Sequence, residues 1–132
     1  WAKYFDSGLI ICHKTRIRAN EVADMKVIGD VEGKNIIVVD DMIDTAGTIC
    51  KAADMLIDNG AASVRAVATH AVLSGKAYEN IEKSKLTEVI FTDSIPQKQP
   101  CSKIKVLPIA PMFADTIRNI YEHKSISDHF LM

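Results

Sequence analysis

The distribution of apolar positions predicts alternating strands and helices along the chain. Residues 35–39 are mostly β-branched and apolar without alternation, which is typical of a strand covered on both faces, as in a parallel sheet. Between Thr48 and Asn59 the apolar residues have the i, i+3, i+4, i+7 spacing of one helical face, and Gly60 follows where a helix would end. Residues 63–70 are apolar again. These segments predict one strand–helix–strand unit with parallel strands.

The remaining segments continue this alternation. Further strands are predicted at residues 9–12, 21–29, 87–93 and 104–107, and helices at residues 76–85 and around 112–121. Residues 13–20 have neither period, which favours a loop. Residues 1–5 resemble the end of a helix that is already under way, so we expect the chain to be a fragment of a longer protein.

Composition and charge narrow the possible classes. The chain has 132 residues, 48% of them hydrophobic, which is enough for one domain with a real core. Its net charge is −1 and its basic residues are scattered, so neither a nucleic acid nor a membrane is an expected partner. The three cysteines have no C-x-x-C spacing, and we expect reduced, buried thiols in a cytoplasmic protein.

Candidate chemistry lies directly after residues 35–39. Asp40 and Asp41 fall at the carboxyl end of the predicted strand, where ligands of open α/β sheets bind. In the loop that follows, Gly47 allows close backbone approach, Thr45 and Thr48 offer hydroxyls, and a helix start presents free N–H groups. Two carboxylates beside an anion-binding loop suit a phosphorylated sugar, with the acids on ribose hydroxyls or a divalent metal.

Each of these residues also has a purely structural interpretation. The whole stretch could be a strand-to-helix turn capped by acidic residues, and for Asp44 alone this interpretation is favoured. Adjacent strand residues point to opposite faces, so Asp40 is a stronger candidate than Asp41. The cations of residues 14–18 could be solvated surface. His70, at a predicted strand end, is more readily a hydrogen-bonded structural histidine than a catalytic one.

Three segments together resemble a known family. Residues 38–48 resemble the ribose 5-phosphate loop shared by type I phosphoribosyltransferases and ribose-phosphate pyrophosphokinases, and the ending Asp-Thr-Ala-Gly-Thr is closer to the pyrophosphokinases. Residues 13–20 are similar to their mobile catalytic loop, with Lys14 and Arg16 as its Lys-x-Arg pair. Residues 69–75 resemble their Thr-His-x-x-x-Ser-Gly segment. Thr15 and the missing prolines depart from the family pattern and leave Arg18 without a role.

The resemblance implies a fold and an activity. The implied fold class is α/β, a Rossmann-like three-layer sandwich with a mainly parallel sheet, and residues 1–132 would be a single domain from the C-terminal half of a longer chain. The implied reaction transfers the diphosphoryl group of ATP to the C1 hydroxyl of ribose 5-phosphate, giving 5-phosphoribosyl 1-diphosphate (PRPP) and AMP. The fragment alone would bind ribose 5-phosphate weakly without catalysing the reaction. The implied cofactor is Mg²⁺, with no certain metal ligand in this chain.

The resemblance also implies roles for individual residues. Lys14 and Arg16 would be catalytic, by stabilising the transferring group. Substrate would be bound by Asp40, Asp41, Asp44, Thr45, Ala46, Gly47 and Thr48. Ser125 and Ser127 resemble part of an allosteric phosphate site. The implied partners are ribose 5-phosphate, Mg-ATP and further copies of the chain, with hexamers typical of the family.

Two alternatives share the same loop. A type I phosphoribosyltransferase would bind PRPP and release diphosphate; Asp44 and the Thr-His-x-x-x-Ser-Gly segment argue against it. A non-catalytic regulatory subunit of a PRPP synthetase would be expected to have lost Lys14, Arg16 or the acidic loop, and all are present. A scaffold whose motifs are only turns is disfavoured by three matches in the expected order.

Overall fold

The computed structural model describes residues 2–18 and 21–127, and for residues 13–18 and 21–26 it describes the backbone alone. The chain divides into two compact units. One unit comprises residues 9–107, and the other combines the first eight residues with the segment from residue 108 onward.

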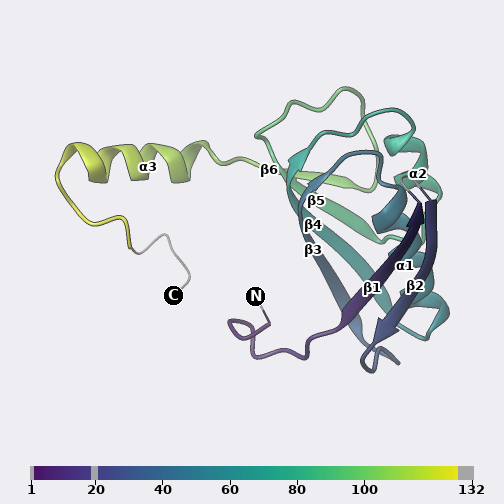
Figure 1. Ribbon diagram of the computed structural model, residues 1–132. Helices are drawn as coiled ribbons and strands as arrows, with labels where there is room; N and C mark the ends of the chain where they lie inside the picture. Colours follow the sequence, from purple (N-terminus) through teal and green to yellow (C-terminus); the bar gives the residue numbers. More distant parts are fainter. Residues whose placement is uncertain (1, 19–20, 128–132) are drawn as a thin grey trace. The chain divides into compact units, whose positions relative to one another are not determined.

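A four-stranded parallel sheet forms the centre of the unit of residues 9–107 (Figure 1). Its strands follow one another in sequence order: β3 (Asn35–Ile43), β4 (Ser63–Ala71), β5 (Glu88–Thr92) and β6 (Ile104–Leu107). Helix α1 (Gly47–Asp58) connects β3 to β4, and helix α2 (Ala77–Lys83) connects β4 to β5. The predicted strand–helix–strand unit is therefore confirmed, as are the α/β class and the parallel sheet.

Both helices pack against one face of this sheet. Leu56 of α1 and Ile81 of α2 belong to the same buried cluster as Val64 of β4 and Val89 of β5. All four side chains are fully buried. Helix α1 ends where the sequence predicts, because Gly60 adopts a φ of +95°, which glycine reaches without strain.

The opposite face of the sheet is different. Along β3, Ile36 and Ile43 are buried, whereas Ile37 is 61% exposed and Val39 is 46% exposed. The expectation that both faces of this strand are covered is therefore not met within this unit. The continuous apolar run reflects the preference of β-branched residues for strands, and it does not reveal which face a helix covers.

An antiparallel hairpin precedes the sheet. It consists of β1 (Ile11–Arg18) and β2 (Glu21–Ile28), with Ile11 opposite Ile28 and register shifts on either side of Arg16. The predicted strand at residues 21–29 is confirmed, but the predicted loop at residues 13–20 is wrong as far as Arg18. Pairing with β2 supplies the backbone hydrogen bonds of a strand even where side-chain periodicity is absent.

The other unit contains helix α3 (Ala110–Tyr121), as predicted. Its apolar side chains, Met112, Phe113, Ile117, Ile120 and Tyr121, are all exposed. The Ser7 N–H donates to the Ala2 carbonyl (3.0 Å), the Asp6 N–H donates to the Lys3 carbonyl (3.4 Å), and Asp6 has a φ of +47°. These are the hydrogen bonds and the left-handed residue of a Schellman helix end, so residues 2–7 have the geometry of the predicted helix end. Among the described helices, none is long and apolar enough to cross a membrane.

Candidate functional site at the carboxyl edge of the sheet

The carboxyl ends of three parallel strands bring most of the predicted site residues to one edge of the sheet. Strand β3 ends at Ile43, β4 at Ala71 and β5 at Thr92. Residues 44–46 connect β3 to the first turn of α1, and residues 72–76 connect β4 to α2. Because the strands are parallel and in register, these two connections leave the sheet at the same edge.

Asp40 and Asp41 lie inside β3, because the strand continues to Ile43 and does not stop before the carboxylates as predicted. Both are exposed, as is Met42, so the alternation of buried and exposed residues is interrupted here. Asp40 accepts a hydrogen bond from the Asp41 N–H (2.9 Å), and Asp41 accepts one from the Met42 N–H (2.7 Å). Each carboxylate therefore has a fixed orientation and an oxygen left for a ligand.

The loop after β3 has a strained residue before the helix. Ala46, not Gly47, adopts the left-handed conformation, with a φ of +60°, and its side chain is buried. This conformation is unfavourable for a residue with a Cβ and persists only where the surroundings enforce it. Ala46, the N-cap residue of α1, makes no side-chain capping hydrogen bond.

Gly47 leaves room above this helix start. A Cβ built at Gly47 would meet only Thr45 Oγ1, at 3.8 Å, which is an ordinary contact. The folded loop therefore does not need a glycine at this position, but a ligand approaching the backbone N–H groups would use the space. A helix N-terminus with its positive dipole end suits an anion such as a phosphate.

The connection between β4 and α2 is hydrogen-bonded to the loop between β3 and α1. Leu73 N–H donates to the Ile43 carbonyl and Ser74 N–H to the Asp44 carbonyl, both at 3.1 Å. The Ser74 hydroxyl donates to the Asp44 carboxylate, and Asn80 Nδ2 of α2 donates to the Thr45 carbonyl at 2.9 Å. Neither Ser74 nor Asn80 was among the predicted site residues. Only the shared Ser-Gly motif could have pointed to Ser74, and nothing in the pattern pointed to Asn80.

His70 is hydrogen-bonded, as predicted. Its Nδ1 lies 2.9 Å from the Ser94 hydroxyl, which belongs to the turn after β5. The Thr92 hydroxyl donates to the Thr69 carbonyl at 2.7 Å, so the ends of β4 and β5 are joined by side chains as well as by strand pairing. These contacts connect the carboxyl ends of β4 and β5 at the edge of the sheet.

The structure leaves the roles of Lys14 and Arg16 as predictions. Both residues lie in β1, opposite Met25 and Val22 of β2. Their side chains are outside the described residues, as are those of Thr15 and Arg18. The hairpin therefore gives the backbone positions of Lys14 and Arg16 but not the positions of their charged groups.

The tail residues Ser125 and Ser127 belong to the other unit. Their hydroxyls lie 2.7 Å apart, and Ser127 N–H donates to the Ser125 hydroxyl at 3.1 Å. This is a local turn of the kind that serine side chains commonly stabilise. Their assignment to a phosphate site is untested by this geometry.

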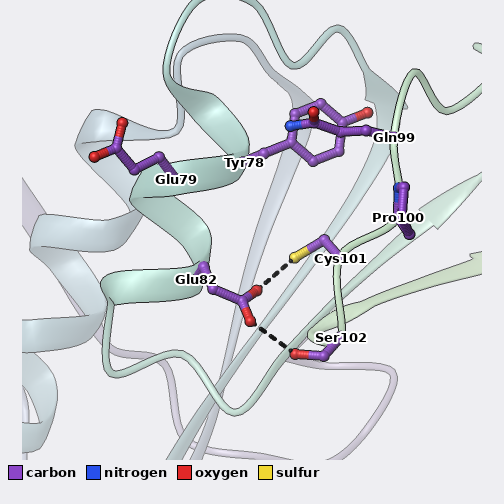
Figure 2. Close-up of a pocket in the computed structure, with 7 residues that line it drawn as sticks. All are labelled: Tyr78, Glu79, Glu82, Gln99, Pro100, Cys101 and Ser102. Carbon is purple, nitrogen blue, oxygen red and sulfur yellow. Dashed lines mark hydrogen bonds between the residues drawn. The ribbon is translucent and has the colours of Figure 1, made fainter.

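A hollow of about 420 Å³ lies between α2 and the loop before β6 (Figure 2). Figure 2 shows Tyr78 and Glu82 of the helix directed toward the loop of residues 99–102, whereas the Glu79 side chain points away from that loop. The Glu82 carboxylate accepts hydrogen bonds from the Cys101 thiol and the Ser102 hydroxyl, both at 3.0 Å. These two bonds hold the pKa of Glu82 below its usual value, and burial raises the pKa of the Cys101 thiol. The hollow contains no predicted site residue, and its contacts fasten the loop to the helix.

Comparisons with known proteins agree on one family. The profile of the phosphoribosyl synthetase-associated domain matches residues 11–131. The ribose-phosphate pyrophosphokinase of Porphyromonas gingivalis is 50% identical over 127 residues, which cover 96% of this chain and 41% of that protein. The Helicobacter hepaticus protein of the same name is 56% identical over 122 residues, covering 92% of this chain and 40% of that protein.

A solved structure shares the fold. The crystal structure of phosphoribosylpyrophosphate synthetase from Mycobacterium smegmatis superposes with a TM-score of 0.82 at 40% identity, covering 93% of this chain and 40% of that one. The chain thus spans about two-fifths of the length of the curated relatives that it matches.

Proposed function

Because the chain belongs to the phosphoribosyl synthetase-associated domain family, we propose that it forms the ribose 5-phosphate-binding part of a ribose-phosphate pyrophosphokinase. The observation that carries this proposal is the loop of residues 44–48 at the carboxyl edge of the sheet, where α1 begins after Ala46 and where there is open space at Gly47. Identity of about half to relatives with that name supports it. In this proposal, residues 1–132 are one phosphoribosyltransferase-like domain from the C-terminal part of a longer protein.

The loop would bind the 5-phosphate. The backbone N–H groups at the start of α1, with the hydroxyls of Thr45 and Thr48, would donate hydrogen bonds to its oxygens, while Ala46 and Gly47 supply the backbone shape. Asp40, with Asp41 beside it, would accept hydrogen bonds from the ribose hydroxyls. The sugar would thus be held at both ends against the edge of one sheet, which fixes its anomeric hydroxyl for reaction.

The reaction is a transfer of two phosphoryl groups as one unit. The C1 hydroxyl oxygen of the sugar forms a bond to the β-phosphorus of Mg-ATP, the bond between that phosphorus and the bridging oxygen of AMP breaks, and the hydroxyl proton is released. Lys14 and Arg16 would neutralise charge on the transferring group, Lys14 as a point charge and Arg16 through two parallel hydrogen bonds. Positioning and charge neutralisation suffice, without a general base from this chain.

Mg²⁺ would supply charge neutralisation on the phosphates. Among the described residues no group of three histidine, cysteine or acidic side chains could hold a metal ion. Mg²⁺ usually takes one or two carboxylates from a protein and completes its shell with water and substrate oxygens. Asp40 and Asp41, both exposed and adjacent, would either accept the ribose hydroxyls directly or supply carboxylates to an Mg²⁺ ion on those hydroxyls.

Further assignments belong to the same proposal. Ser125 and Ser127 would contribute to a phosphate-binding regulatory site, and the protein would act in the cytoplasm as a homo-oligomer, a hexamer in the family. Neither a nucleic acid nor a membrane is a partner in this proposal. The net charge of −1 agrees with this, because it offers no broad attraction to either polyanionic surface.

The proposal is tested by isothermal titration of the chain with ribose 5-phosphate, with and without Mg²⁺. Ribose and inorganic phosphate are the control ligands, because ribose has only the sugar hydroxyls and inorganic phosphate has only the anionic group. We expect ribose 5-phosphate to bind more tightly than either half, and we expect no AMP from the isolated chain with Mg-ATP. Equal affinity for inorganic phosphate, or no binding of the sugar phosphate at all, would refute a ribose 5-phosphate site, and AMP release would refute dependence on a further domain.

A further inference from the structure

The conformation of residues 44–47 requires support from outside the loop, because Ala46 is strained. Ala46 holds a left-handed conformation that disfavours residues with a Cβ, yet its carbonyl accepts the Cys50 N–H (3.0 Å), the first backbone bond of α1. A strained residue at the first hydrogen bond of a helix will relax unless its neighbours prevent it. The restraint must come from the groups that hold the residues immediately before it.

Two side chains from outside the loop supply that restraint. The Ser74 hydroxyl donates to the Asp44 carboxylate, and Asn80 Nδ2 donates to the Thr45 carbonyl at 2.9 Å. Both donors lie on the chain between β4 and the end of α2, about 30 residues further along, and both are half-buried. They bind the two residues that directly precede Ala46: Asp44 through its side chain and Thr45 through its backbone carbonyl.

The hydrogen bond from Ser74 also explains why an acidic residue, Asp44, lies beside the proposed phosphate site. A carboxylate repels a phosphate, so Asp44 is poorly suited to contact the 5-phosphate directly. Its carboxylate instead accepts the Ser74 hydroxyl, while its carbonyl accepts the Ser74 N–H at 3.1 Å. Asp44 is therefore bound at two points to the second connection, which suits a residue that fixes the loop rather than one that binds the ligand.

We propose that Ser74 and Asn80 are positioning residues of the ribose 5-phosphate loop, acting through Asp44 and Thr45 to hold the backbone N–H groups at the start of α1 ready for a phosphate. This inference rests on the proposed function, since it names the residues that preorganise the same site. Preorganisation strengthens binding because the ligand does not have to order the loop.

The test uses the 132-residue chain and four variants. Ser74→Ala and Asn80→Ala each remove one donor, and Ser74→Thr keeps the hydroxyl. Ser63→Ala is the matched control, because Ser63 donates to Asn35 at the opposite end of the same strand pair. The first measurement is amide hydrogen exchange at Leu73 and Cys50, with Val89 in the core as reference. The second is the Kd for ribose 5-phosphate by titration.

In Ser74→Ala and Asn80→Ala, we expect exchange at Leu73 and Cys50 to accelerate about five- to tenfold, as for loss of one hydrogen bond, and the Kd to rise by about tenfold. Exchange at Val89 should not change. Ser74→Thr and Ser63→Ala should stay within about twofold of the parent chain in both measurements, the usual range for a surface change.

Several results would overturn the proposal. One is that exchange at Leu73 and Cys50 is unchanged in both Ser74→Ala and Asn80→Ala. Another is that exchange accelerates in these variants while the Kd for ribose 5-phosphate does not change. The third is that Ser74→Thr behaves like Ser74→Ala. Should Ser74→Ala also accelerate Val89, and so have lost global stability, Asn80→Ala decides by the same criteria. If the parent chain does not bind ribose 5-phosphate, the proposed function fails, whereas the exchange rates still report whether these two donors hold the loop.

Discussion

Ser74 is bound to Asp44 twice, through its hydroxyl to the carboxylate and through its N–H to the carbonyl at 3.1 Å. The two residues are separated by 30 positions and belong to connections that follow neighbouring parallel strands. The loop after β3 can reach its final conformation only when β4 has paired with β3. Formation of the candidate site is therefore coupled to formation of the sheet.

Leu56 tests the packing of α1 on the sheet. Its side chain is fully buried, so Leu56→Ala should lower the free energy of unfolding by about 3 kcal/mol through lost burial and the cavity left behind. Ile37→Ala is the matched control on the open face and should cost about 0.5 kcal/mol or less. Urea denaturation of both variants measures the difference. A cost at Ile37 similar to that at Leu56 would mean that this face is covered in solution.

Lys14 and Arg16 should affect catalysis but not sugar binding. In the isolated chain, Lys14→Ala and Arg16→Ala should leave the Kd for ribose 5-phosphate within about twofold, because their charge is used only on the transferring group. In a chimaera in which this chain replaces the matching 41% of the Porphyromonas gingivalis protein, each should reduce kcat for AMP formation by about 10²-fold or more.

Lys34→Ala is the control in that chimaera, since Lys34 pairs with Asp30 in an exposed turn. Its kcat should equal that of the parent chimaera. Full activity of the Lys14 and Arg16 variants, or a large rise in their Kd for the sugar in the isolated chain, would contradict the assigned roles.

Glu82 should contribute to acid sensitivity. The hydrogen bonds from Cys101 and Ser102 lower its pKa from 4.5 in the folded protein, so its contribution to stability is present above that pH and is lost as the pH falls through the folded value. In Glu82→Gln the free energy of unfolding should fall less steeply than in the parent chain as the pH is lowered below 4.5. Ser102→Ala, which removes one donor, should give an intermediate curve. Identical curves for all three proteins would show that the bonds to Glu82 do not persist in solution.

Local patterns predicted most of the fold. The apolar face of α1, the stop at Gly60 and the strands β4, β5 and β6 are all visible in the sequence because periodicity and turn chemistry are local properties. The hairpin arm at residues 13–18 was missed, since its strand conformation depends on pairing with β2 rather than on side-chain alternation. The open face of β3 was missed because an apolar run does not state how many faces are covered.

In the candidate site, too, local features could be predicted from the sequence and contacts between distant residues could not. Asp40, Asp41 and the loop of residues 44–48 could be found because their residue types are those that sugar and phosphate recognition requires. Gly47 was expected to allow close backbone approach, and the open space at this position agrees with that. The positive φ of Ala46 was not predicted, because it goes against the preference of its residue type. The contact of Asn80 with Thr45 joins residues 35 positions apart, and no local pattern encodes it.

The most direct test of a phosphate-binding loop at residues 44–48 is the affinity of Gly47→Ala for ribose 5-phosphate, measured by isothermal titration. The added methyl group meets only Thr45 Oγ1 at 3.8 Å in the folded protein, so it should not destabilise the chain, but it fills the space that a phosphate would enter. Gly8→Ala is the matched control, because a Cβ there meets nothing within 4 Å. We expect Gly47→Ala to raise the Kd by about tenfold or more, equivalent to about 1.4 kcal/mol, with an unchanged unfolding transition and with Gly8→Ala identical to the parent chain. Equal affinity of Gly47→Ala and the parent chain would contradict the assignment of the phosphate to this loop.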